Sequence, residues 1–104
     1  MAFHRVTALA DLWSGDLLAA RVAGVAVLVL RVGDTVRAYE DRCAHLGVAL
    51  SAGTLADNVL TCSAHHWQYD ASTGRGLNPA TACLRAFAVE IRDGAVYVDP
   101  AVPA

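Results

Sequence analysis

Two short segments of the chain each carry one cysteine and one histidine. The first is Cys43-Ala44-His45 and the second is Cys62-Ser63-Ala64-His65, with sixteen residues between His45 and Cys62. Thiolates and imidazoles are ligands that zinc ions and some iron–sulfur clusters take from proteins. Two of each can hold one tetrahedral zinc ion, or one [2Fe–2S] cluster in which histidine replaces cysteine on one iron.

The order of the ligands within the two segments discriminates between these metals. Zinc ribbons and fingers pair like ligands, whereas here each segment is mixed and the cysteine comes first in both. A single zinc ion has no need of that repetition. A dinuclear cluster does, because Cys43 and Cys62 can reach one iron while His45 and His65 reach the other. The pattern therefore favours a [2Fe–2S] cluster, and a structural zinc module is the alternative from a different class.

Three further side chains near these segments are weaker indicators of a role at the metal site. Cys83 has apolar neighbours and is expected to be a small core residue. His66 directly follows the second segment, and a surface role is favoured for it over a ligand role. Trp67 is expected to pack beside the metal site rather than to form a docking surface.

The elements that must position these segments have the patterns of short strands. Residues 25–30 form a continuous apolar run, typical of a strand buried on both faces. A turn signal at Gly33-Asp34 follows, and residues 35–39 alternate between polar and apolar positions, which predicts a hairpin. Residues 7–12 are instead predicted to form one short helix with Thr7 as its N-cap.

A second hairpin is predicted near the end of the chain. Asp93-Gly94 is the strongest turn signal in the sequence, and residues 95–98 are predicted to form the second strand of the hairpin. Phe87, Val89 and Ile91 share one face of the preceding strand, and Glu90 and Arg92 lie on the opposite face.

The region between the hairpins is different in character. It holds two of the three cysteines and three of the four histidines, and its periodicity is weak. Irregular segments carried by a rigid framework are where sites usually lie. The sequence therefore predicts an all-β fold of small antiparallel sheets, forming one domain over residues 1–104, with the metal-binding loops on a subdomain at about 41–82.

Length and composition exclude several classes of function. A chain of 104 residues has room for one domain, which excludes a large enzyme with separate cofactor and substrate domains. A net charge of -2 gives no support to nucleic-acid binding, and the longest apolar run is too short to span a bilayer. No secretory signal is visible and the cysteine spacing is not that of a disulfide framework, so a cytoplasmic protein is expected.

The two mixed segments resemble the signature of Rieske [2Fe–2S] proteins, which is C-x-H and C-x2-H about 16 residues apart. Leu46-Gly47 follows the first histidine as in many members, and Asn78-Pro79 stands where the family has a loop that covers the cluster. Nearly the whole chain looks closest to the small ferredoxin components of aromatic or alkene monooxygenases. Its other matching stretches are residues 12–16, 38–40, 61–65 with Trp67, 76–79, and Cys83 with Leu84.

The resemblance implies the Rieske fold and an electron carrier rather than an enzyme. Cys43 and Cys62 would bind one iron, and His45 and His65 the other. The protein would accept one electron from an NADH-dependent flavin reductase and pass it to the hydroxylase component of an oxygenase, a diiron enzyme acting on a small hydrocarbon. The ferredoxin of a ring-hydroxylating dioxygenase is the alternative, and a monomer is expected. A catalytic Rieske oxygenase subunit is not expected at this length.

The sequence also departs from the Rieske proteins of respiratory complexes. Val48 and Ala64 stand where those proteins have a further pair of cysteines that form a disulfide. Trp67 replaces a serine donor, and His66 stands where many members have glycine. Tyr69 occupies the position of a tyrosine donor, so the resemblance implies a hydrogen bond from it to a ligating sulfur.

Four acidic residues flank the ligand segments: Glu40, Asp41, Asp57 and Asp70. They are expected to form either a solvated rim or an acidic ring that meets a basic partner protein. The sequence leaves both interpretations open.

Overall fold

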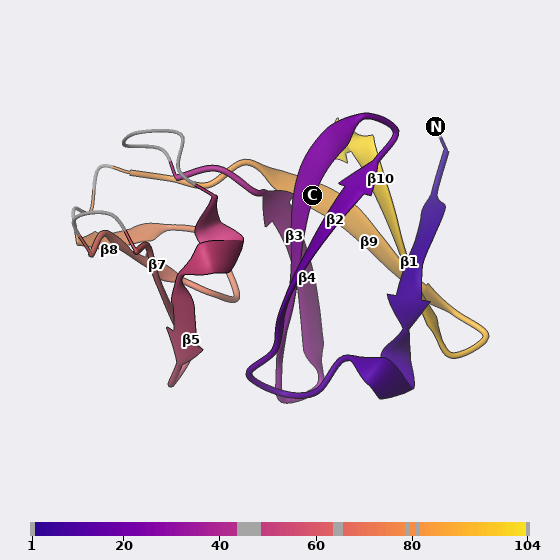
Figure 1. Cartoon of the computed structure of the whole chain (residues 1–104), viewed down its shortest axis with the longest axis horizontal. Helices are drawn as coiled ribbons and strands as arrows, with labels where there is room; N and C mark the ends of the chain where they lie inside the picture. Colours follow the sequence, from indigo (N-terminus) through magenta and orange to yellow (C-terminus); the bar gives the residue numbers. More distant parts are fainter. Residues whose placement is uncertain (1, 44–48, 64–65, 79, 81, 104) are drawn as a thin grey trace.

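The computed structural model of the protein describes residues 2–43, 49–63, 66–78, 80 and 82–103, which form two antiparallel β-sheets (Figure 1). The six-stranded sheet has the order β1-β10-β9-β4-β3-β2, and the four-stranded sheet has the order β5-β6-β7-β8. The predicted all-β fold of small antiparallel sheets is thus confirmed. In chain order the elements are β1 (His4–Ala8), η1 (Leu9–Asp11), β2 (Leu17–Val22), β3 (Val25–Val32), β4 (Thr35–Glu40), η2 (Leu50–Ala52), β5 (Thr54–Ala56), β6 (Val59–Thr61), β7 (Gln68–Asp70), β8 (Gly76–Asn78), β9 (Ala86–Arg92) and β10 (Ala95–Pro103).

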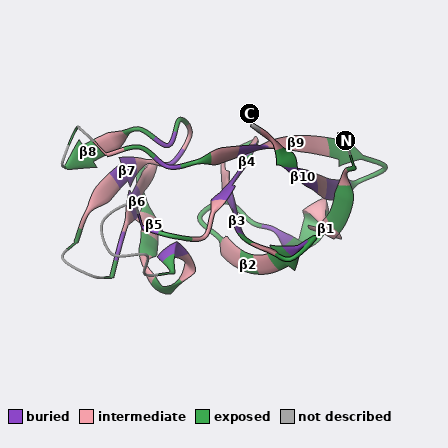
Figure 2. Ribbon diagram, turned by 90° about the horizontal axis from the view of Figure 1, so that it is seen from above, coloured by how far each residue is buried: buried purple, intermediate pink, exposed green. Residues whose placement is uncertain are grey.

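The six-stranded sheet contains both predicted hairpins. β3 pairs with β4 along most of its length, and residues 27–30 are fully buried, as a strand covered on both faces requires. β9 pairs with β10 across Asp93 and Gly94, whose positive φ angles of 48° and 72° suit a two-residue turn matched to the strand twist. The strands curve into an open ring around one of the two apolar clusters (Figure 2).

The helix predicted over residues 7–12 is wrong. Thr7 belongs to β1, which pairs with β10, and only the 3-10 turn η1 follows it, without a side-chain cap. Val6 packs against the core of the six-stranded sheet and Leu12 is buried in it. A helix of so few residues is not stable by itself, so strand pairing and core packing decide the conformation.

The four-stranded sheet lies in the middle of the chain, where the sequence shows little periodicity. Each of its strands is three residues long, too short for an alternating pattern to be recognised. Its strands pair in sequence order, and Thr61↔Gln68 is the last β6–β7 pair before the loop that contains Cys62. The segment with Cys43 instead connects the two sheets, because it leaves β4 and leads through η2 to β5.

A buried tyrosine joins the two sheets. Tyr39 in β4 is 1% exposed, and its hydroxyl donates a 2.7 Å hydrogen bond to the carbonyl of Ala71, just beyond β7. Gly74 has a φ of +78°, and a Cβ there would lie 2.8 Å from the Tyr39 ring, so the close approach requires glycine. Burial raises the pKa of Tyr39 to about 12, so the hydroxyl keeps its proton at neutral pH.

Tyr39→Phe should lower the free energy of unfolding by about 1–3 kcal/mol, because the Ala71 carbonyl loses its partner inside the protein. The raised pKa adds a pH dependence. Stability from the protonated hydroxyl is complete below pH 10.0 and is lost as the pH rises through about 12, and the variant should lack this decline. Urea titrations at neutral and alkaline pH measure both effects.

Tyr97→Phe is the matched control for this measurement. The Tyr97 ring stacks with Arg92, and among the described residues no hydrogen bond of its hydroxyl is found. Loss of the Tyr97 hydroxyl should lower the free energy of unfolding much less than loss of the Tyr39 hydroxyl. Equal destabilisation by the two substitutions would contradict the role assigned to the Tyr39–Ala71 bond.

Candidate metal centre

The two candidate ligand cysteines are both buried in the same apolar cluster. Cys43 is 1% exposed and Cys62 is 0% exposed, although they arrive from separate loops. Two thiols enclosed by one apolar core fit a metal centre with thiolate ligands held away from water. His45 and His65 lie outside the described residues, and the predicted ligand set as a whole stays a prediction. Both sheets contribute to the cluster, whose other buried members are Leu28, Leu30, Tyr39, Leu50, Leu60, Tyr69, Ala71 and Leu84.

A tyrosine hydroxyl lies beside one of the two sulfurs. Tyr69 in β7 is fully buried, and its Oη lies 3.4 Å from Sγ of Cys43. Either atom can donate while Cys43 carries a proton, but a thiolate can only accept, so the hydroxyl donates to a metal-bound sulfur. The structure thus shows the contact between Tyr69 and the Cys43 sulfur, and donation to a ligating sulfur stays a prediction because it requires Cys43 to be a ligand.

The loop of residues 62–67 is closed at its base by a backbone hydrogen bond. The N–H of Cys62 donates to the carbonyl of Trp67 at 2.7 Å, directly beyond the last pair of β6 and β7. Trp67 packs against the apolar cluster that contains both cysteines, as predicted. His66 is exposed, as expected for a surface residue, and has a φ of 54°, where glycine is the least strained residue.

The acidic residues near the ligand segments have different surroundings. Asp41 accepts two hydrogen bonds from Ser51, at 2.8 and 2.7 Å, so its carboxylate is not simply solvated. Glu40 lies 3.7 Å from the guanidinium of Arg85. Asp57 is exposed in the turn between β5 and β6 and is the clearest solvent-facing carboxylate of the four.

Asp70 also has an internal structural role. One of its carboxylate oxygens accepts hydrogen bonds from the backbone N–H groups of Ser72 and Thr73 and from the side chains of Ser72 and Asn58. The Ser72 hydroxyl makes the largest contribution to lowering the pKa of Asp70. Asp41 and Asp70 are therefore more than a solvated rim, because both hold loops or turns together, and the acidic ring stays a prediction.

Cys83 is exposed, so the expectation that it is a core residue is wrong. Cys83 lies between β8 and β9, and it forms an isolated bridge with Arg75, which directly precedes β8. The next residue, Leu84, is 6% exposed and belongs to the cluster around the two buried cysteines. Neighbouring side chains of an extended segment point to opposite sides, so Leu84 takes the core side and Cys83 faces solvent.

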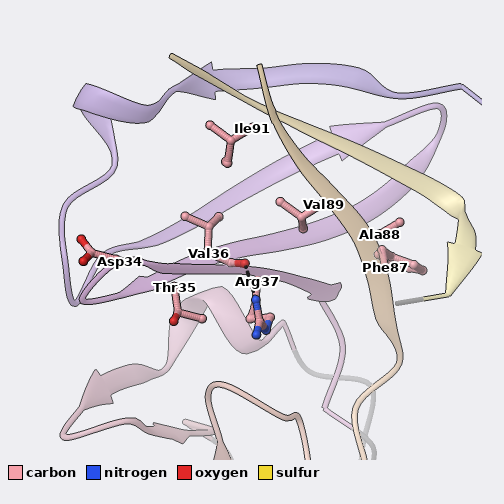
Figure 3. A pocket seen from close by; sticks show the side chains of 8 residues that line it. All are labelled: Asp34, Thr35, Val36, Arg37, Phe87, Ala88, Val89 and Ile91. Carbon is pink, nitrogen blue, oxygen red and sulfur yellow. Dashed lines mark hydrogen bonds between the residues drawn. The ribbon is translucent and has the colours of Figure 1, made fainter. Parts of the chain in front are cut away.

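An open groove of about 690 Å³ lies between β4 and β9 (Figure 3). The two strands pair at only two positions around Tyr39 and then diverge. Burial therefore falls along one face of β9, where Phe87 is 2% exposed while Ile91 is 44% exposed. Neither Cys43 nor Cys62 lines the groove, so it is separate from the candidate metal centre.

Similarity to known proteins agrees with this arrangement. Residues 2–88 match the model of the Rieske [2Fe-2S] domain family. The ferredoxin component of the alkene monooxygenase system of Xanthobacter autotrophicus is 37% identical over 94 residues, which cover 89% of this chain and 77% of that protein.

Solved structures show the same similarity. The ferredoxin of carbazole 1,9a-dioxygenase from Nocardioides aromaticivorans IC177 superposes with a TM-score of 0.87 at 29% identity, covering 96% of this chain and 99% of the other. One chain in a complex of reduced oxygenase and oxidised ferredoxin in carbazole 1,9a-dioxygenase matches with a TM-score of 0.84 at 37% identity, covering 92% and 91%.

An all-β scaffold with two buried cysteines on separate loops is the architecture of a small iron–sulfur protein. The chain belongs to the Rieske [2Fe–2S] domain family. The cofactor of that family is the one that the two mixed ligand segments predicted, and the buried pair of thiols fits it. When bound, the cluster supplies one-electron oxidation and reduction at iron. The chain itself supplies apolar cover and the Tyr69 donor.

Among the described residues, none of the helices has the length and apolar character that a membrane span needs.

Tyr69→Phe should lower the midpoint potential by roughly 40 mV if Cys43 is a cluster ligand. The hydroxyl stabilises the reduced, more negative cluster, and about 1 kcal/mol of such stabilisation corresponds to a shift of this size for one electron. Protein-film voltammetry measures the potential. Tyr39→Phe is the control, because it removes a buried hydroxyl bonded to Ala71 and should leave the potential unchanged. An unchanged potential in Tyr69→Phe would contradict the prediction.

Proposed function

We propose that this chain is a Rieske ferredoxin that carries one electron between two other proteins. In this proposal Cys43 and Cys62 bind one iron, and His45 and His65 bind the other. The burial of both thiols in one apolar cluster beside the Tyr69 hydroxyl is the observation that carries the proposal. The repeated cysteine-before-histidine order of the two segments supplies the rest of the ligand set.

The surroundings of the second ligand segment suit an electron carrier. Ser63 and His66, on either side of residues 64–65, are both exposed. Cys62, at the other end of the segment, is fully buried. The described residues of this segment thus combine one buried candidate ligand with exposed neighbours, which would give electrons a short path to a partner. A protein with this function needs that exposed edge and does not need a substrate pocket.

The proposed partners are a flavin-dependent reductase that uses NADH and the hydroxylase component of an oxygenase. The relative from Xanthobacter is the ferredoxin component of an alkene monooxygenase system, which supports a monooxygenase as the partner. The family resemblance of the sequence implies that this partner is a diiron enzyme for a small aromatic or alkene hydrocarbon. The solved complex of an oxygenase with its ferredoxin supports direct docking between two such proteins. We further propose that the carrier is monomeric and cytoplasmic.

A ferredoxin that serves a ring-hydroxylating dioxygenase is the second candidate. The matching structure from Nocardioides is the ferredoxin of a dioxygenase, and the fold of the two chains agrees over nearly their whole lengths. The two candidates share the cluster and the reductase and differ in the terminal oxygenase. Rates of electron delivery from the reduced protein to a purified diiron hydroxylase and to a purified dioxygenase would distinguish them.

The purified protein should contain about two irons and two acid-labile sulfides per chain. Metal and sulfide analysis measures this directly. The reduced form should give a Rieske-type EPR signal with an average g value below that of the free electron. Stoichiometric zinc, or the axial signal of a plant-type ferredoxin with four cysteine ligands, would contradict the proposed site.

The assignment of His65 rather than His66 as a ligand gives a further prediction. His65→Ala should lose the cluster or fail to assemble it, because one iron loses a ligand. His66→Ala should retain the cluster, since His66 is exposed, and should change the potential only modestly. Iron content and visible spectra of the two variants decide between them. Bleaching of His66→Ala with retention of colour in His65→Ala would place the ligand one residue later.

A further inference from the structure

The loop of residues 42–50, which contains Cys43 and His45, is bracketed by two residues that bind each other. Asp41 precedes the loop and Ser51 follows it. The backbone N–H of Ser51 donates to Oδ1 of Asp41 at 2.8 Å, and the Ser51 hydroxyl donates to Oδ2 at 2.7 Å. Both carboxylate oxygens are therefore engaged by one residue across the base of the loop. We call this pair the Asp41–Ser51 clasp.

Each side of the clasp is anchored to a different part of the fold. Asp41 directly follows β4, and its N–H donates to the carbonyl of Ala26 in β3 at 3.0 Å. Ser51 lies in η2, whose first residue, Leu50, is fully buried in the cluster that contains both cysteines. The next turn is packed against β6, because a Cβ on Gly53 would overlap the carbonyl oxygen of Thr61. The clasp thus ties the six-stranded sheet to the element that leads into the four-stranded sheet.

The first ligand loop needs a side-chain clasp because it has no strand ladder at its base. The second loop continues the β6–β7 hairpin and is closed by the Cys62–Trp67 backbone bond. The first loop joins two sheets, and its ends are elements that do not pair with each other. Hydrogen bonds to an ionised carboxylate are shorter and stronger than neutral ones, so the Asp41–Ser51 pair can fix this loop where backbone pairing cannot.

We propose that Asp41 and Ser51 are positioning residues that hold the first ligand loop in the shape that retains the [2Fe–2S] cluster. This inference rests on the proposed function, because it assigns the clasp a role toward the cluster. It differs from a docking role for Asp41, in which the negative charge itself would matter. The clasp requires the geometry of two hydrogen bonds, which the charge strengthens but which an uncharged side chain of the same shape can also form.

Asparagine at position 41 separates geometry from charge. Its amide oxygen can accept from the Ser51 N–H, and its NH2 group can donate to the Ser51 hydroxyl, so both contacts persist without a charge. Alanine removes both contacts and the charge. Asp57→Asn removes the same charge at the exposed β5–β6 turn, where asparagine tolerates the φ of 51°, and it serves as the matched control.

The experiment measures the half-time of cluster loss from the holoprotein in the presence of an iron chelator, followed by visible absorbance. Asp41→Ala should lose the cluster about tenfold faster than the wild type, and Ser51→Ala several-fold faster. Asp41→Asn should stay within about threefold of the wild type, and Asp57→Asn should equal it. The Asp41→Ala/Ser51→Ala double variant should lose the cluster no faster than Asp41→Ala, because the two residues act as one pair.

Three results would overturn the inference. A rate of cluster loss in Asp41→Ala equal to that in Asp57→Asn would show that the clasp does not act on the cluster. A rate in Asp41→Asn equal to that in Asp41→Ala would show that charge rather than geometry matters. Additive effects in the double variant would show that the two residues act separately. If Asp41→Ala does not assemble a cluster, the yield of reconstituted cluster in Ser51→Ala and Asp41→Asn replaces the rate and is expected to follow the same order.

The wild-type protein distinguishes failure of this inference from failure of the proposed function. Stoichiometric zinc, or no cluster after reconstitution, would overturn both. A wild-type protein with a Rieske EPR signal, together with variants that lose the cluster at the wild-type rate, would overturn the clasp alone.

Discussion

The burial of two cysteine thiols in one apolar cluster is the constraint on which the rest of the structure depends. A thiolate taken out of water is costly unless a metal or a hydrogen-bond donor compensates its charge. Cys43 and Cys62 come from different loops, so their common burial requires that the two sheets be fixed to each other. Two buried tyrosines make that junction. Tyr39 of the larger sheet donates to the segment after β7, and Tyr69 of the smaller sheet contacts the sulfur of Cys43.

The two ligand loops are held in different ways because their origins differ. The loop after β6 continues a hairpin, so the ladder of β6 and β7 closes its base through the backbone of Cys62 and Trp67. The loop after β4 connects one sheet to the other and has no ladder to continue. A carboxylate at its start and a serine at its end take over that function. Closing a loop at its base reduces the freedom of every residue within it, so a few bonds position several ligands.

The sequence predicted the parts of this structure that follow from local rules. β3 contains a continuous apolar run and β4 alternates between polar and apolar residues, while the turn at Asp93 and Gly94 needs residues that accept a positive φ. The β5 to β8 strands are too short to show a period, and the bonds between Asp41 and Ser51 join residues ten positions apart with no local signature. The position of Cys83 depends on the side that Leu84 takes, which only the assembled core decides.

The placement of the carboxylates shows how folding limits the use of charge near the ligand loops. Asp41 accepts hydrogen bonds that close a loop, Asp70 accepts hydrogen bonds that hold a turn, and Glu40 lies beside the guanidinium of Arg85. Removing the side chain of Asp41 or Asp70 would therefore change the hydrogen bonds of a loop or turn as well as the charge at its surface. These fixed hydrogen bonds suit an electron carrier, whose cluster would change by one unit of charge in each cycle. Dipoles and loops that are already fixed need no rearrangement when that charge arrives or leaves.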